Sequence, residues 1–272
     1  MHILIPTLIL FSMALVFGFI LVFASKKLAV MEDETVIKVQ ALLSGANCGA
    51  CGYPGCAGFA SALVKGKVDL SSCTSTSLHN KEEIAKLIGG EVVAMEKNIV
   101  ICACCGGNRC QDKYEYQGYG NCLSVELLAG GRKACPTGCI GMGSCVDVCA
   151  FHAIEVNELG FSEVNHDKCT VCGQCVKICP KNVLKILPYY AKIYIACSSR
   201  ERGRAVSAVC PVGCIGCGLC AKVCPEGAII MEDNLPIIDY KKCTACGKCI
   251  EKCPTKVIKW IDDSIEKNDS VS

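Results

Sequence analysis

The stretch "CIGCGLCAKVCP" (214–225) spaces three cysteines two residues apart, adds a fourth after three more residues, and ends on proline. The same pattern, C-x2-C-x2-C-x3-C-P, occurs at 169–180 and again at 243–254. A near copy at 139–149 keeps the other cysteines but has Met142 in place of the second one. Three tandem matches of this length do not arise by chance, so this repeat decides how the C-terminal half folds.

Cysteine is the residue that sets this chain apart. The sequence has 272 residues and 27 cysteines, whereas aromatic residues make up only 6% and the net charge is +2. A chain so nearly neutral has no basic field for nucleic acid. Dense cysteine indicates either a disulfide scaffold in a secreted protein or metal ligation inside the cell, so the compartment decides between the two.

The N-terminus predicts the compartment. Residues 3–24, "ILIPTLILFSMALVFGFILVFA", contain no charge, and this length is enough to cross a bilayer. Lys26 and Lys27 follow directly, and no basic segment precedes the apolar stretch, which predicts an uncleaved anchor with the rest of the chain in the cytoplasm. The alternative is a buried helix of a soluble protein. A cytoplasmic location is reducing, which favours metal ligation over disulfides.

The repeated pattern is the ligand run of bacterial ferredoxins, in which the fourth cysteine of one run binds the cluster of the other. The last two runs therefore predict two [4Fe–4S] sites: Cys214, Cys217, Cys220 and Cys253 for one, and Cys243, Cys246, Cys249 and Cys224 for the other. Between the runs, 227–242 reads as strand, turn and strand, as 152–168 does before the preceding run. Each pair of runs predicts a small ferredoxin-like unit.

The defective run leaves one ligand set incomplete. One site of the first unit is straightforward and takes Cys149, Cys169, Cys172 and Cys175. The other has Cys139, Cys145 and Cys179 and needs one more ligand. Two hypotheses stay open: Cys135 turns back to complete the set, or the site holds a three-iron cluster. A thioether is a weak donor, so Met142 is expected to pack as an apolar residue.

The region before the repeats holds a further cysteine module. Cys48, Cys51, Cys56 and Cys73 follow a short predicted helix at 32–43, lie among glycines, and enclose a helical stretch at 57–64. Glycine permits a tight loop around a cluster, although four cysteines also suit zinc. Because the same chain contains the ferredoxin runs, an iron–sulfur cluster is favoured over zinc for this module. Asn80 is expected to start a further helix.

Five cysteines between this module and the repeats are harder to assign. A further cluster is predicted from Cys102, Cys104 or Cys105, Cys110 and Cys122, with Cys135 as another donor. The alternative is that some of them are buried free thiols. Cys197 and Cys210 have few neighbours in the sequence, and neither is expected to bind metal.

Other chemistry finds no support in the sequence. No dinucleotide or P-loop motif is present, and no histidine or carboxylate arrangement predicts a catalytic site. The fold class predicted is α+β, with a single transmembrane helix, a small Fe–S module and two tandem two-cluster ferredoxin-like units. The predicted segments are an anchor (1–25), the N-terminal [4Fe–4S] module (26–90), a cysteine-rich middle segment (91–134), two ferredoxin-like units (135–190 and 191–262) and a disordered tail (263–272).

An uncleaved anchor, then "GANCGACGYPGC" (45–56), then tandem ferredoxin runs resembles the B subunit of the Rnf electron-transport complex, in its longer anaerobe form. The resemblance covers nearly the whole chain, with "YEYQGYGNC" (114–122) and the second ferredoxin unit closest to the long form. Ala150 departs from the proline usual at that position. The resemblance implies a single-pass protein of the inner membrane whose five to six [4Fe–4S] clusters, one of them alternatively [3Fe–4S], face the cytoplasm.

The resemblance also implies partners. The chain would accept electrons from soluble reduced ferredoxin and pass them to other subunits of a complex that reduces NAD and exports Na⁺ or H⁺. It would be part of an enzyme without a substrate or nucleotide site of its own. Two alternatives remain: a membrane-tethered polyferredoxin that serves another reductase, and a zinc-rich interaction scaffold.

Overall fold

Short helices and two-stranded sheets make up the protein. The computed structural model describes residues 4–27, 33–90 and 97–261, and the predicted tail (263–272) lies outside them. The helices are α1 (Leu4–Lys27), α2 (Glu34–Leu42), α3 (Cys56–Val64), α4 (Leu78–Ile88), α5 (Cys122–Leu127), α6 (Ser144–Asp147), α7 (Gln174–Ile178), α8 (Arg204–Val209), α9 (Leu219–Val223) and α10 (Lys248–Lys252), with 3-10 turns η1 (Leu70–Ser72) and η2 (Gly107–Arg109). The strands are β1 (Asn98–Cys102), β2 (Ile154–Val156), β3 (Ser162–Val164), β4 (Leu184–Pro188), β5 (Ile193–Ile195), β6 (Ile229–Glu232), β7 (Leu235–Ile238) and β8 (Ile258–Trp260). This mixture confirms the predicted combination of helices and strands around Fe–S modules.

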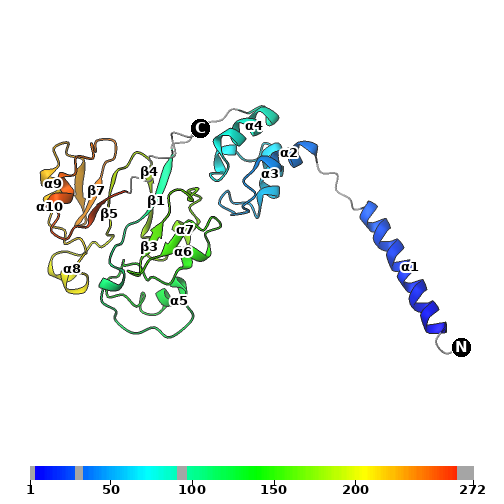
Figure 1. The fold of residues 1–272 in the computed structure, drawn as a ribbon, viewed down its shortest axis with the longest axis horizontal. Helices are drawn as coiled ribbons and strands as arrows, with labels where there is room; N and C mark the ends of the chain where they lie inside the picture. The colour runs from blue at the N-terminus through cyan, green and yellow to red at the C-terminus, as the bar shows by residue number, and fades with distance from the viewer. Residues whose placement is uncertain (1–3, 28–32, 91–96, 262–272) are drawn as a thin grey trace.

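The first helix, α1, extends away from the rest of the chain (Figure 1). Its large apolar side chains are exposed along its length, including Phe11, Phe19 and Leu21. Within the part of the chain that the structure describes, no helix combines the length and apolarity needed to cross a membrane. The membrane anchor therefore stays a prediction.

The N-terminal module packs three helices around one apolar core. Val39 of α2, Phe59 of α3 and Ile84 of α4 are almost fully buried and form its centre. The predicted helices at 32–43 and 57–64 are confirmed by α2 and α3. The predicted start at Asn80 is wrong by a few residues, because the hydroxyl of Ser77 caps α4 by accepting the Asn80 N–H at 3.2 Å.

The first ferredoxin-like unit contains the predicted hairpin of β2 and β3, which pairs Ile154 with Val164. A second, unpredicted sheet joins β1 to β4, with Cys102 opposite Leu184. Strand β1 thus comes from the middle segment, before the cysteine runs, and pairs with β4, which follows both runs of the unit. The core between the two sheets includes Val100 and Val183, which are almost completely buried.

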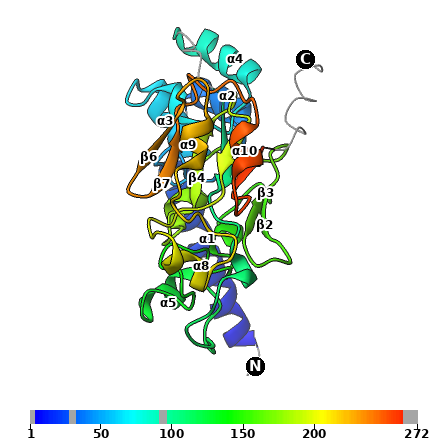
Figure 2. The ribbon, with the colours of Figure 1, turned by 90° about the vertical axis from the view of Figure 1, so that its left-hand side faces the viewer.

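The second unit repeats this plan. Strands β6 and β7 form the predicted hairpin, and β5 pairs with β8 as β1 does with β4. Figure 2 shows this unit from the side on which α9, α10 and the hairpin lie, with α8 at its lower end. The two units are therefore copies of one fold, each completed by a strand that precedes its cysteine runs.

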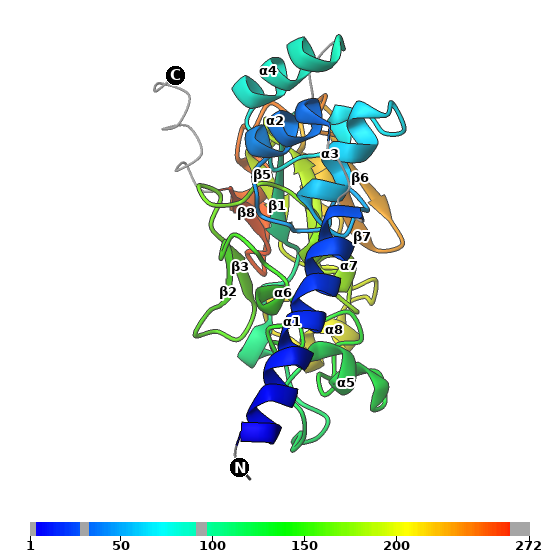
Figure 3. The same ribbon diagram turned by 90° about the vertical axis from the view of Figure 1, so that its right-hand side faces the viewer.

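The modules lie in a row, from the second unit through the first unit to the N-terminal module (Figure 1). Figure 3 views the same row from its other end, with α1 in front and α2, α3 and α4 behind its upper end. Apolar residues from β1 and from the chain around β5 and β8 join the two units, among them Ile101, Ala191 and Ile261. The side chain of Gln174 joins the first unit to the N-terminal module by donating to the Cys48 carbonyl at 2.8 Å.

Candidate iron–sulfur sites

Each cysteine run makes a left-handed turn at the glycine that precedes its short helix. Gly143, Gly173, Gly218 and Gly247 precede α6, α7, α9 and α10, and all four have φ between 70° and 80°. This left-handed conformation costs a residue with a Cβ atom about 1–2 kcal/mol, so glycine suits the turn. The defective run makes the same turn as the intact ones, so the replacement of a cysteine by Met142 leaves the backbone conformation of the run unchanged.

The N-terminal set converges as predicted. Its four cysteines line one cavity: Cys48, Cys51, Cys56 and Cys73. Two hydroxyls accompany the last of them, with Thr76 Oγ1 at 3.1 Å and Ser75 Oγ at 3.6 Å from the Cys73 sulfur. Hydroxyls at this distance can donate to a thiolate and hold it in place.

The second unit also brings its predicted sets together. One cavity is lined by Cys214, Cys217, Cys220 and Cys253, a set that takes its last member from the other run. The second set is Cys224, Cys243, Cys246 and Cys249. Burial raises the pKa of Cys249 to about 11, and the neighbouring Cys243 and Cys246 thiols add to this rise. Cys224 packs against the same apolar cluster as Cys243.

In the first unit, the incomplete set gains a member that the sequence did not predict. The cavity is lined by Cys122, Cys139, Cys145 and Cys179. Cys122 opens α5, and its N–H donates to Ser144 Oγ at 2.8 Å, directly beside the turn that follows Met142. The hypothesis that Cys135 completes this set is therefore corrected: Cys122 lies in the fourth position.

The other set of the first unit meets as predicted. Burial raises the pKa of Cys175 to about 12, and the nearby thiols of Cys169, Cys172 and Cys149, together with Cys145 of the other set, raise it further. The sulfur of Cys149 also accepts the Ala153 N–H at 3.3 Å. Cys224 accepts the Ala228 N–H at the same distance in the second unit. Cys149 and Cys224, the fourth cysteines of the first run in each unit, thus have the same backbone environment in both units.

Two side chains hydrogen-bond to sulfurs of the Cys122-containing set. Ser162 Oγ lies 3.1 Å from the Cys145 sulfur and 3.9 Å from that of Cys139. The buried thiol of Cys102 hydrogen-bonds to Cys139, which lowers the pKa of Cys139 and raises that of Cys102. The Cys102 thiol also donates to the Cys104 carbonyl at 3.5 Å, so it lies beside Cys139 and Cys104 without lining the cavity of the other middle cysteines.

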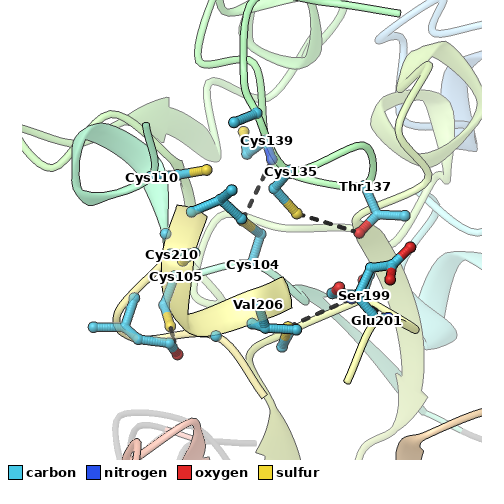
Figure 4. A pocket seen from close by; sticks show the side chains of 18 of the residues that line it. Cys104, Cys105, Cys110, Cys135, Thr137, Cys139, Ser199, Glu201, Val206 and Cys210 are labelled. Atoms are coloured by element: carbon cyan, nitrogen blue, oxygen red, sulfur yellow. Dashed lines mark hydrogen bonds between the residues drawn. The ribbon is translucent and has the colours of Figure 1, made fainter. Parts of the chain in front are cut away.

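A wider cavity of about 210 Å³ lies between the two units (Figure 4). The cysteines that line it are Cys104, Cys105, Cys110, Cys135, Cys139, Cys197 and Cys210. Of the middle set predicted from the sequence, Cys104, Cys110 and Cys135 lie here, whereas Cys102 and Cys122 do not. Cys197 and Cys210, which were not expected to have partners, line the same space.

The donor chemistry suits iron–sulfur clusters, because four thiolates line each of three cavities. Among the described residues, no three histidine, cysteine or acidic side chains converge closely enough to hold one metal ion. Four thiolates on one zinc would stand about 3.8 Å apart, since each Zn–S bond is about 2.3 Å. The cysteines here surround cavities, which suits a four-iron cage bound at its corners.

Comparison with protein families agrees with this division of the chain. Residues 43–75 match the profile of an Fe-S cluster family. Residues 213–258 match one 4Fe-4S dicluster domain profile, and a second profile of that description matches 137–183 and 168–228. The last match takes one run from each unit, whereas the structure pairs each run with its neighbour inside a unit.

Comparison with curated proteins covers most of the chain. The B subunit of an ion-translocating oxidoreductase complex from Methanosarcina acetivorans is 41% identical over 228 residues, which is 84% of this chain and 86% of that protein. The B subunit of the Na(+)-translocating ferredoxin:NAD(+) oxidoreductase complex from Acetobacterium woodii is 38% identical and aligns with 89% of this chain and 73% of its own length. The B subunit of the proton-translocating ferredoxin:NAD(+) oxidoreductase complex from Clostridium ljungdahlii is 38% identical, with coverages of 84% and 81%.

Proposed function

Since the chain belongs to the family of B subunits of ion-translocating oxidoreductase complexes, we propose that it takes electrons from reduced ferredoxin and relays them to partner subunits. The complex would reduce NAD and export Na⁺ or H⁺. The resemblance to the Rnf B subunit that the sequence suggested is confirmed by these relatives. The chain is an iron–sulfur electron-transfer subunit, and one observation carries the proposal: its cysteine sets lie in a row of adjoining modules.

Five sets of four cysteines would hold the clusters. They are Cys48, Cys51, Cys56 and Cys73; Cys122, Cys139, Cys145 and Cys179; Cys149, Cys169, Cys172 and Cys175; Cys214, Cys217, Cys220 and Cys253; and Cys224, Cys243, Cys246 and Cys249. When bound, a [4Fe–4S] cluster takes up and gives off one electron at a time. The chain's part is to fix the spacing of these sites and to shield them from water.

The contacts between modules support a continuous relay. Gln174 follows the Cys172 turn and donates to the Cys48 carbonyl, which places one set of the first unit against the N-terminal set. The thiol of Cys48 lies near enough to Cys172 to contribute to the raised pKa of Cys172, behind burial as the main cause. Both contacts favour transfer between the first unit and the N-terminal module.

The second unit is the entry point we favour for ferredoxin. Cys217 and Cys246 are exposed, whereas Cys172, the counterpart of Cys246 in the first unit, is half-buried. Exposed lysines lie beside Cys246 in the sequence, among them Lys242 and Lys248. Such charges would attract a reduced, negatively charged donor and raise the rate of encounter.

We further propose that α1 anchors the chain in the inner membrane, with the Fe–S modules on the cytoplasmic side. The support is the uncharged stretch at 3–24 and the exposed apolar side chains of α1, such as Leu8, Phe17 and Phe23. These side chains would cost free energy in water. Full-length chain should pellet with membranes and resist salt washing, whereas a chain that starts at residue 28 should be released.

The functional experiment uses membrane vesicles that carry the whole complex. Reversing the two lysines with Lys242→Glu and Lys248→Glu should raise the KM for reduced ferredoxin several-fold and weaken its salt dependence, because fewer charges attract the donor. A matched pair, Lys65→Glu and Lys67→Glu in the N-terminal module, should leave the KM unchanged. NAD reduction that persists without this chain would contradict the proposal and favour service to another reductase.

A further inference from the structure

The cavity between the two ferredoxin-like units is unlike the cavities that three of the cysteine sets line. Its volume is about 210 Å³, compared with about 20 Å³ for the cavity of the Cys214 set. Figure 4 shows Cys104, Cys110 and Cys135 around this space, with the backbone of Cys139 donating to the Cys104 sulfur. Cysteines, small apolar residues, hydroxyl side chains and Glu201 line this cavity. Apart from Cys139, its cysteines belong to none of the five sets.

Two of these cysteines occupy equivalent places in the two units. Ala103 and Ala196 each donate their N–H to the carbonyl of the valine that directly precedes the neighbouring strand, at 2.6 and 2.8 Å. The residue after each alanine is a cysteine, Cys104 or Cys197. Cys104 accepts the N–H of Cys139 at 3.3 Å, and Cys197 accepts that of Cys214, the matching run residue, at 3.4 Å.

Two further cysteines are also equivalent. Cys135 and Cys210 each precede a proline and begin a tight turn into a cysteine run. In the first turn the Gly138 N–H donates to the Cys135 carbonyl at 3.2 Å, and in the second the Gly213 N–H donates to the Cys210 carbonyl at 3.1 Å. Each unit thus presents one pair of thiols, related by the repeat, to the same cavity.

We propose that Cys104, Cys135, Cys197 and Cys210 bind a sixth [4Fe–4S] cluster, two ligands from each unit; this inference rests on the proposed electron-relay function. The N–H donors to Cys104 and Cys197 resemble those to Cys149 and Cys224 in the predicted sets. Backbone N–H groups that point at sulfur stabilise a ligating thiolate.

The two other unassigned thiols in the cavity lack this repeat relationship. Cys105 has Ser198 as its counterpart in the second unit, and its thiol points to the Val212 carbonyl at 3.9 Å. The thiol of Cys110 interacts with those of Cys135 and Cys210, and it belongs to the loop around η2. Cys110 is thus the strongest rival as a ligand, and the experiment must separate it from Cys197.

The proposed site lies between a cysteine set of the first unit and one of the second. Cys104 is one hydrogen bond from Cys139, which belongs to a set of the first unit, and Cys197 is one hydrogen bond from Cys214 of the second. Backbone contacts hold the two units together here, because Cys105 N–H donates to the Ala196 carbonyl at 3.1 Å. A cluster at this point would connect the two units for electron transfer.

The test is iron and sulfide analysis of the full-length chain, purified without oxygen. Six sites of four irons give about twenty-four irons per chain, and five sites give about twenty. We expect about twenty-four for the unaltered chain and between one and about four fewer for Cys197→Ser and for Cys104→Ser, because a site without one ligand loses a corner iron or its whole cluster. The EPR signal of one centre should change or disappear with that iron. Cys105→Ser, the matched change in the same cavity, should keep about twenty-four.

Each other result overturns the inference in a defined way. About twenty irons in the unaltered chain would show that the cavity holds no cluster, whatever the variants do. Loss of iron in Cys110→Ser but not in Cys197→Ser would replace the proposed ligand set. A chain without iron would instead remove the proposed function itself, so the two failures can be told apart.

Discussion

The two ferredoxin-like units have the same strands, turns and paired runs, yet they supply their first cysteine set differently. In the second unit Cys217 lies within the run, whereas the first unit has Met142 there and brings in Cys122 from α5. The backbone turn is the same in both, with Gly143 and Gly218 in the left-handed conformation. The backbone fold of the unit is therefore the same whether the fourth thiol of this cysteine set lies within the run or comes from α5.

The units also differ in what surrounds these sulfurs. Ser162 pairs with Val156 in the first hairpin, and the equivalent position of the second hairpin is Pro236, opposite Met231. Cys102, which hydrogen-bonds to Cys139, has Ile195 as its counterpart. The first unit thus offers hydrogen-bond donors to cluster sulfur where the second offers apolar side chains. Such donors stabilise the more negative, reduced state and raise its potential.

The largest expected effect comes from removing the borrowed ligand. Cys122→Ser should lower the iron content by at least one and at most about four atoms per chain, because a [4Fe–4S] site loses a corner iron or the whole cluster. Iron analysis and EPR of the oxidised protein distinguish these results. Cys102→Ser, which removes a nearby thiol that is no ligand, should leave the iron content unchanged.

The same site offers a rescue. Met142→Cys restores the pattern of the second unit, so the double variant with Cys122→Ser should recover the iron that the single variant loses. Full iron in Cys122→Ser alone would contradict the assignment, as would a double variant that stays depleted.

A smaller effect is expected on potential. Ser162→Ala removes a donor to Cys145 and should lower the potential of one first-unit cluster by roughly 20–60 mV, since a hydrogen bond contributes about 1 kcal/mol and one electron is transferred. An EPR-monitored redox titration measures the shift. Pro236→Ala, at the matched position, should leave the second unit's potentials in place. A potential that rises in Ser162→Ala would refute the role given to the hydroxyl.

The smallest effect concerns the contact with the N-terminal module. Gln174 lies directly after the turn glycine, where the second unit has Leu219 and Lys248. Gln174→Leu should remove about 1 kcal/mol of docking and increase amide hydrogen exchange around Cys48 about fivefold in the metal-loaded protein. Lys248→Leu, the equivalent change in the last run, should leave that exchange unaltered. Equal exchange in the two variants would show that the contact does not hold the module.

The sequence predicted what local spacing controls. The hairpins at β2–β3 and β6–β7 and the helices α2 and α3 follow from short patterns, and all were found. The sheets β1–β4 and β5–β8 were not predicted, because they join strands far apart in the chain that local periodicity cannot pair.

The ligand sets show a similar limit. Cys122 was missed as a member of the first-unit set because it lies well outside the run. Cys122 also stands as far before Cys135 as Cys197 stands before Cys210, so spacing alone would match Cys122 with Cys197. The hydrogen bonds show instead that Cys104 corresponds to Cys197. Cys104 and Cys197 each directly follow an alanine, Ala103 or Ala196, and this was the signal in the sequence that could have revealed their correspondence.

The most direct test of the central claim is to count the electrons that the full-length, anaerobically purified chain accepts from reduced ferredoxin. A relay with one-electron centres in every cysteine set should take up five or six electrons per chain, with bleaching of its visible absorbance in proportion. A chain that takes up no electrons from reduced ferredoxin, or that carries no iron at all, would contradict the account.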